Sequence, residues 1–193
     1  MNRGKLLCLT SLCVASVFGI QLVRADVGAA NGGGSGGNER LIANLTIQLR
    51  KINSQLGVAQ AKLEEISTLI TQDGRRALEM QGELETANDL TGMMRELSIM
   101  MDGLDDLEQA LENVKTNVNA LDDLFSAIRR MALNINDQSF QTLLSTTHTH
   151  LLLVQSLISK DATGITNLRN GLENLMDHIR QQIEGGGITV SAP

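Results

Sequence analysis

The chain has 193 residues and a formal net charge of −6, and only 2 % of its residues are aromatic, with no Trp and no Tyr. Small-ligand pockets are usually lined by aromatic side chains, and an acidic surface repels nucleic-acid phosphates. We therefore expect no cofactor and no nucleic-acid partner.

Residues 1–25 have the pattern of a secretory signal peptide. Arg3 and Lys5 precede an apolar run, and Val23 and Ala25 stand where a signal peptidase reads small residues, so we predict cleavage after Ala25. The alternative is a retained N-terminal membrane anchor. Cleavage removes both cysteines and leaves 13 basic against 22 acidic residues, a net charge of −9. We therefore predict a secreted protein, extracellular or periplasmic, without disulfides.

Residues 26–38 are predicted to form a flexible linker. Positions 27–37 read VGAANGGGSGG and offer nothing large enough to bury. Asn38 is suited to cap a helix, and Glu39 to stand in its first turn. A single helical-bundle domain is therefore predicted over residues 39–184, followed by a disordered C-terminal tail over residues 185–193.

Three blocks of apolar residues, over positions 42–87, 90–135 and 140–179, recur with alternating steps of three and four. Only an α-helix places such a series on one face, and another helix must cover that face. The residues predicted to form this heptad core are Leu49, Ile52, Leu56, Leu63, Leu97, Leu104, Leu107, Leu111, Leu121, Phe125, Ile128, Leu151, Val154, Ile158, Leu168, Leu172 and Leu175.

The blocks are separated by residues that favour helix ends. Asn88 and Asp89 are predicted to cap the second block, and residues 136–139 are predicted to form a polar turn before the third. The predicted fold is all-α: an elongated antiparallel helical bundle of three long helices with coiled-coil-like packing. The alternative breaks the helices at glycines 74, 103 and 164 into four or five shorter ones.

The positions that flank the first apolar seam are mostly uncharged; they are Thr46, Gln48, Asn53, Gln55, Gln60 and Ser67. Charged pairs at such flanks normally select the partner and the register of a coiled coil. Their absence favours packing within one chain, although a homo-oligomer stays open as an alternative.

Asn44 begins an N-glycosylation sequon with Leu45 and Thr46, to be weighed against a chance tripeptide. His148 and His150 are the residues most like metal ligands. A spacing of two places their side chains on different sides of a helix, and no acidic residue stands at ligand spacing. We therefore expect a polar interruption of the core around Thr147 and no metal site.

Methionines concentrate over positions 80–101, where core filling is preferred to a copper site. Five acidic residues over positions 102–112 lack the spacing of a calcium loop and form a run without a basic partner in sequence. We read them as a solvated helix face; the alternative is a weak cation site or a contact for a basic partner. No nucleophile elbow, phosphate loop or metalloprotease motif occurs. No catalytic residue is therefore predicted, and the chain is not expected to be an enzyme.

The layout of signal peptide, linker and cysteine-free helical bundle is similar to that of periplasmic minor pilus subunits of type IV secretion systems. The function favoured by the sequence is a secreted, non-enzymatic structural or protein-interaction module, such as an adhesin-like, pilus-associated or matrix component. Its unknown protein partner would bind an exposed helix face or a loop near Asn88 or Asn136. The alternative is a lipid-binding protein whose bundle opens on membranes or lipid particles. No segment after the signal peptide approaches the apolar length of a membrane span.

Overall fold

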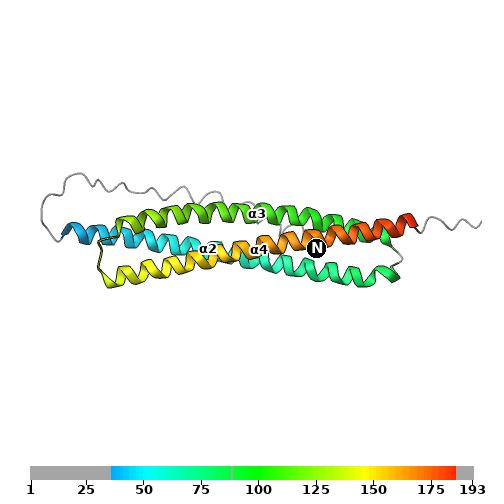
Figure 1. The fold of residues 1–193 in the computed structure, drawn as a ribbon, viewed down its shortest axis with the longest axis horizontal. Helices are drawn as coiled ribbons and strands as arrows, with labels where there is room; N and C mark the ends of the chain where they lie inside the picture. The colour runs from blue at the N-terminus through cyan, green and yellow to red at the C-terminus, as the bar shows by residue number, and fades with distance from the viewer. Residues whose placement is uncertain (1–35, 88, 186–193) are drawn as a thin grey trace, which may run out of the picture. The chain divides into compact units, whose positions relative to one another are not determined.

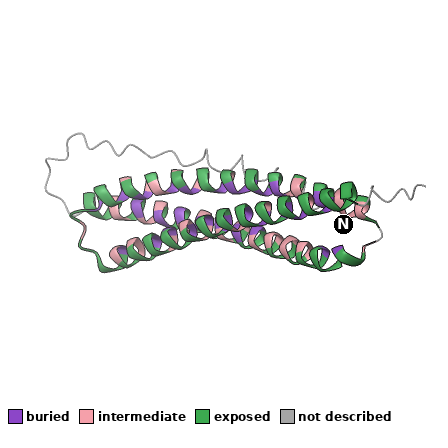
Figure 2. Ribbon diagram, turned by 45° about the vertical axis from the view of Figure 1, so that its right-hand side comes forward, coloured by how far each residue is buried: buried purple, intermediate pink, exposed green. Residues whose placement is uncertain are grey.

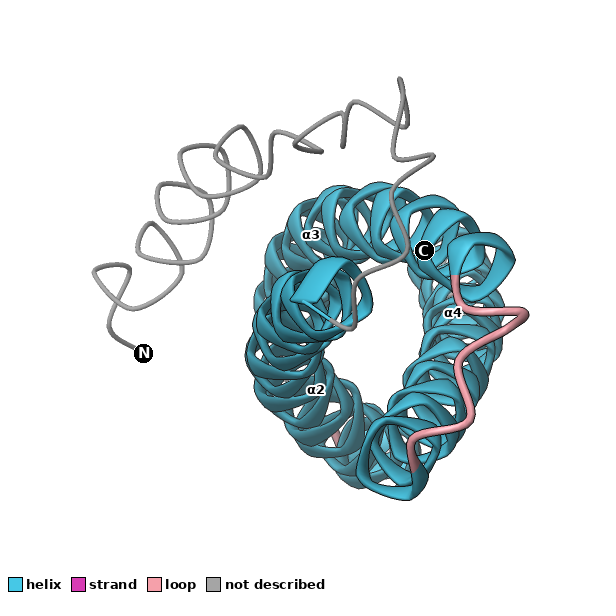
Figure 3. Ribbon diagram, turned by 90° about the vertical axis from the view of Figure 1, so that its left-hand side faces the viewer, coloured by secondary structure: helices cyan, strands magenta, loops and turns pink. Residues whose placement is uncertain are grey.

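The structure is a computed structural model that describes residues 36–87 and 89–185. Its elements are α2 (Gly36–Glu83), the short 3-10 helix η2 (Leu84–Thr86), α3 (Leu90–Met131) and α4 (Gln138–Gly185) (Figure 1). Helices make up 95 % of the described residues, and no strand occurs among them (Figure 3). The predicted all-α helical bundle is confirmed. The predicted signal peptide and residues 186–193 of the predicted tail lie outside the described residues.

The three predicted long helices form, and the alternative of four or five shorter ones is wrong. α2 passes through Gly74, α3 through Gly103 and α4 through Gly164 without interruption. A glycine inside a helix costs only about 1 kcal/mol relative to alanine. Burial of the apolar residues on either side of each glycine offsets that cost.

The domain bounds differ slightly from those predicted. α2 begins at Gly36, so the last three residues of the predicted linker are helical, and α4 ends at Gly185, one residue beyond the predicted end of the bundle. Asn38 consequently lies inside the first turn of α2 and does not precede it. Helix ends are determined only to within one or two residues by local sequence preferences.

Aspartates cap both α3 and α4 at their N-termini. The Gly92 amide donates to Asp89 Oδ1 at 2.7 Å, and the Phe140 amide donates to Asp137 Oδ1 at 2.8 Å. Each bond satisfies an amide that has no partner within its own helix. The predicted caps at Asp89 and within residues 136–139 are therefore confirmed. The predicted turn is displaced, because α3 already ends at Met131 and α4 begins at Gln138.

The three helices pack in two compact units. Unit 1 contains residues 36–62 and 112–158, and unit 2 contains the described residues within 63–111 and 159–185. Each unit therefore has one segment of α2, one of α3 and one of α4 (Figure 1).

In unit 1, α4 runs parallel to α2 and antiparallel to α3. Asn53 contacts Thr147 and Gln60 contacts His150, so residue numbers rise together along α2 and α4. Along α3 and α4, residue numbers run in opposite directions, because Asp122 contacts Gln155 whereas Phe125 contacts His148. The order is therefore up, down, up.

In unit 2, α2 and α3 form a helical hairpin through residues 84–89. Arg76 binds Glu96 across this hairpin with N···O distances of 2.7 and 3.1 Å. Two nitrogens of the Arg76 guanidinium thus bind the two oxygens of the Glu96 carboxylate. Such a bidentate contact is the strongest geometry for an ion pair. Against α4, residue numbers again rise together, because Ser67 hydrogen-bonds Asp161 whereas Gln81 and His178 line one recess.

The core of each unit is formed by the repeating apolar positions. Every residue of the predicted heptad core is at most 9 % exposed. Buried residues occupy the sides of the helices that face their neighbours, and exposed residues the outer sides (Figure 2). Within the described ranges, no helix combines the length and the apolarity needed to cross a bilayer.

Candidate functional site

A chain of hydrogen bonds joins α2 and α4 in unit 1. Asn53 Nδ2 donates to Thr147 Oγ1 at 2.8 Å, and Thr147 Oγ1 donates to the Leu143 carbonyl at 2.8 Å. Thr147 is fully buried at a seam position. Because the Thr147 hydroxyl donates its proton to the Leu143 carbonyl, it can only accept a hydrogen bond from Asn53. The Asn53 amide nitrogen therefore points to Thr147, and the amide oxygen points to a different partner.

His150 occupies the oxygen side of this amide. Its Nδ1 lies 3.2 Å from Asn53 Oδ1, and its Nε2 lies 3.2 Å from Gln60 Oε1. The imidazole is thereby held by two α2 side chains two turns apart. We call Asn53, Gln60, Thr147 and His150 the polar clasp. Asn53 and Thr147 satisfy each other, and both ring nitrogens of His150 lie within hydrogen-bond distance of an α2 side chain, so the clasp positions α4 along α2.

His148 belongs to the other side of α4. Its ring stacks on Phe125 of α3 with centroids 5.5 Å apart and planes inclined by 2°. Phe125 is buried, whereas His148 is exposed. The two histidines thus face different helices, and no group of three or more potential metal ligands exists in the described part of the chain.

Unit 2 contains carboxylates at seam positions. Asp161 is only 2 % exposed, it hydrogen-bonds Ser67 of α2, and its Oδ2 has no hydrogen-bond partner. Burial raises the pKa of Asp161 above its usual value, while the charge of Lys160 and the Ser67 hydrogen bond act in the opposite direction. Burial likewise raises the pKa of Asp73. Asp161 is the carboxylate that is buried in the core of unit 2, and its ionised form destabilises that core, whereas Asp73 is half-buried.

The expectation that the acidic run of α3 lacks basic partners is wrong. Arg169 of α4 donates to Asp105 Oδ1 and Glu108 Oε2, both at 2.8 Å, and Lys115 binds Glu112 at 2.9 Å. Arg169 stands 61 residues or more from its partners, so only the fold brings them together. Asp102 and Asp106 remain exposed on the outer side of α3.

The first part of α4 has an outer surface without charge. Residues 138–159 contain no Asp, Glu, Lys or Arg. Serines and threonines cover most of this surface, and Leu152 and Leu153 stand out from it at 53 % and 48 % exposure. Adjacent positions of a helix point about 100° apart, so the two leucines extend the apolar part of this uncharged surface in two directions.

Charge is divided unequally between the two units. The described residues of unit 1 include seven basic and five acidic side chains, a net charge of +2. Those of unit 2 include six basic and sixteen acidic side chains, a net charge of −10. The acidity of the chain is therefore a property of unit 2.

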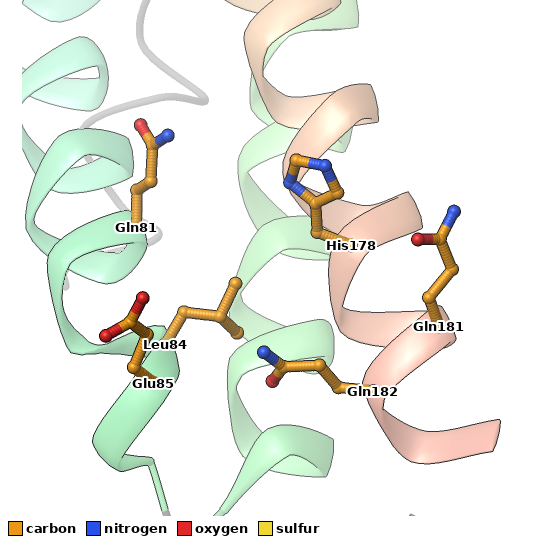
Figure 4. A pocket seen from close by; sticks show the side chains of 6 residues that line it. All are labelled: Gln81, Leu84, Glu85, His178, Gln181 and Gln182. Carbon is orange, nitrogen blue, oxygen red and sulfur yellow. The ribbon is translucent and has the colours of Figure 1, made fainter. Parts of the chain in front are cut away.

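A shallow recess of about 410 Å³ lies between α2, η2 and α4 in unit 2 (Figure 4). Its lining residues are Gln81, Leu84, Glu85, His178, Gln181 and Gln182. His178 and Gln182 extend from α4 toward Leu84, which is the buried residue of the group (Figure 4). The other lining side chains are exposed and polar, so the recess offers hydrogen bonds but little apolar enclosure.

The remaining described residues singled out from sequence lie on α2, on α3 and in the connection between α3 and α4. Asn44 is exposed on α2, so a glycan there would not meet the core. Met80 and Met100 are buried at 1 % and 8 % exposure, as core-filling residues are. Asn88 lies outside the described residues, and Asn136 is exposed between α3 and α4.

Comparison with protein families, with curated proteins and with solved structures gives no match to this chain. Its function must therefore be argued from its own residues. Two features escaped the reasoning from sequence: the charge-free face of α4 and the concentration of acidic residues in unit 2. Both features can be seen in the sequence as stretches of biased composition. Only the fold shows which stretches lie together in one unit.

Proposed function

We propose that this chain is an exported, non-enzymatic helical-bundle protein that serves as a structural or protein-interaction module, of an adhesin-like, pilus-associated or matrix kind. The observation that carries this proposal is the charge-free outer face of α4 in unit 1, with Leu152 and Leu153 at its surface. The centres of protein interfaces are depleted of charged residues in the same way.

The polar clasp and the caps support such a role. They fix α4 along α2, so the exposed leucines are presented by a helix whose register is already determined. His148, stacked on Phe125, borders the same face and is held in one orientation. A preorganised surface loses less conformational freedom when a partner binds.

Affinity capture from the native compartment tests this surface. The full chain is used as bait beside the double variant Leu152→Glu, Leu153→Glu and the control Leu78→Glu, whose leucine is 69 % exposed on α2 of unit 2. We expect the double variant to lose partners that the wild type and the control retain. Equal capture by all three, with helicity unchanged by circular dichroism, would exclude α4 as the binding surface.

Export is tested separately by N-terminal sequencing of the protein recovered outside the cytoplasm. Processing after Ala25 leaves Asp26 as the first residue. A product that retains Met1, or that stays in the cytoplasm, removes the exported part of the proposal and leaves the α4 surface to be judged by capture.

Lipid binding is the second candidate, and one observation favours it. Unit 1 has a net charge of +2, with Arg50 and Lys51 exposed between the exposed Ile47 and Val58 of α2. Basic residues beside aliphatic ones suit an anionic bilayer surface. Flotation with neutral and anionic vesicles decides: retention of the full chain in the soluble fraction with both removes this candidate.

A further inference from the structure

The outer side of α2 in unit 1 carries a stripe of four exposed residues. Ile47, Lys51, Ser54 and Val58 stand at helical spacings of four, three and four, which place them on one face. Ile47 is 51 % and Val58 is 63 % exposed. Lys51 makes no ion pair within the described residues, and no acidic residue occurs from position 40 to position 63. We call these four residues the basic stripe.

The outer side of α3 in unit 2 carries a stripe of opposite charge. Ile99, Asp102 and Asp106 lie at spacings of three and four on one exposed face, and Ile99 is 55 % exposed. Asp105 and Glu108 on the neighbouring face are occupied by Arg169. Asp102 and Asp106 take part in no ion pair with any described residue. We call Ile99, Asp102 and Asp106 the acidic stripe.

We propose that the basic stripe of one copy docks antiparallel on the acidic stripe of a second copy of this chain. Lys51 precedes Val58 by seven residues, and Ile99 precedes Asp106 by seven, so both pairs span roughly 10.5 Å along their helices. An antiparallel contact places Lys51 opposite Asp106 and Val58 opposite Ile99. The small Ser54 lies between them and lets the helices approach.

Charge complementarity identifies a second copy as the occupant. Unit 1 has a net charge of +2 and unit 2 a net charge of −10, so unlike units of two copies attract whereas like acidic units repel. Each copy supplies both stripes. The contact buries a few side chains per helix, well below the area of an obligate interface, so the association is weak and salt-dependent. It uses α2 and α3, apart from the α4 surface of the proposed function.

Charge reversal tests this contact in the full chain by sedimentation velocity at low ionic strength over a range of concentrations. Wild type is expected to self-associate. Lys51→Glu and Asp106→Lys should each weaken association about tenfold, because an exposed attraction is replaced by a repulsion of similar size. An equimolar mixture of the two variants should restore association. When a Lys51→Glu chain meets an Asp106→Lys chain, positions 51 and 106 again carry opposite charges in both possible contacts.

The matched control is Arg75→Glu, which makes the same change of charge at an exposed position of α2 in unit 2. This variant should retain the wild-type association constant. Three results would overturn the proposal: a wild-type chain that stays monomeric throughout, equal weakening by Lys51→Glu and Arg75→Glu, or a mixture that remains dissociated. Capture by anionic vesicles without self-association would assign the basic stripe to a lipid surface instead.

Discussion

At the scale of single residues, Asp161 is the position where the sequence departs most from an ordinary helical core. It occupies a repeat position between Ile158 and Ile165, both buried aliphatic residues. Ser67 satisfies part of its hydrogen-bonding capacity, but its Oδ2 has no partner. A buried carboxylate in this state disfavours its own ionised form. Unit 2 is therefore less stable at neutral pH than its apolar content implies.

We predict that Asp161→Asn increases the free energy of unfolding at pH 7 by roughly 1–3 kcal/mol, because an uncompensated buried charge is removed. Burial raises the pKa of Asp161 in the folded chain above its unfolded value. The penalty is therefore absent below the unfolded pKa and complete above the folded pKa, so the stability contributed by this site falls as pH rises. The gain from the variant should consequently disappear in acid.

Urea unfolding of wild type and variant at several pH values measures this difference, with Asp123→Asn at an exposed position as the control. Comparing the two proteins cancels the contribution of Glu96, whose pKa is lowered by Arg76 and which acts in the opposite direction. A variant that is less stable than wild type at pH 7 would contradict the prediction.

The polar clasp makes a second prediction at this scale. Asn53→Ala removes the α2 partner of the buried Thr147 hydroxyl and one of the two α2 partners of the His150 ring, so we expect a loss of about 1–3 kcal/mol in the free energy of unfolding. Because Asn53 and Thr147 share one bond, the effects of Asn53→Ala and Thr147→Val should not add. A double-mutant cycle by urea unfolding measures the coupling, and strict additivity would show that the clasp is not cooperative.

At the scale of the elements, the caps of α3 and α4 were predictable from sequence. Asp89 and Asp137 were recognisable as caps because a cap needs only a short polar side chain three residues before a free amide. Whether α2 continues through Gly74 could not be decided from sequence. One glycine changes helix stability by only about 1 kcal/mol. The burial of the apolar seam outweighs this cost, and that burial depends on the partner helices.

The cap of α3 has a specific requirement at Gly92. A Cβ on Gly92 would collide with the Asp89 carboxylate in its capping position. We predict that Asp89→Ala lowers stability by about 1 kcal/mol. Gly92→Ala loses the same bond but gains about 1 kcal/mol of helix propensity, so it should stay near the wild-type stability, and adding Asp89→Ala to it should cost less than Asp89→Ala alone. Thermal unfolding followed by circular dichroism measures the three variants. An Asp89→Ala chain as stable as wild type would mean that the capping bond contributes nothing.

The flanks of the seam show where sequence reasoning stops. The uncharged positions of the first block indicated packing within one chain, and Asn53, Gln60 and Ser67 indeed contact α4. Their partners could not be named in advance, because an uncharged amide or hydroxyl accepts many partners and registers. Arg169 was missed for a related reason, since its carboxylates are separated from it by more than 60 residues.

At the scale of the whole molecule, composition alone was misleading about charge. A net charge of −6 for the chain argues against contact with any anionic surface. The division into units shows instead that α2 and α4 of unit 1 present a surface without acidic residues from position 40 to 62 and from 138 to 158. Average charge cannot reveal this, because segments far apart in sequence must first be grouped by the fold.

The surfaces inferred above depend most on α4 lying parallel to α2 in unit 1. Cross-linking with a short bis-maleimide tests this directly in the full chain, with Cys8 and Cys13 replaced by serine. One chain carries Asn53→Cys and His150→Cys, and a second carries Ala43→Cys and Ser156→Cys, a pair that antiparallel helices would bring together. We predict an efficient intramolecular link, identified by mass spectrometry, for the first pair and none for the second. Linking of the second pair without the first would contradict the fold and the surfaces inferred from it.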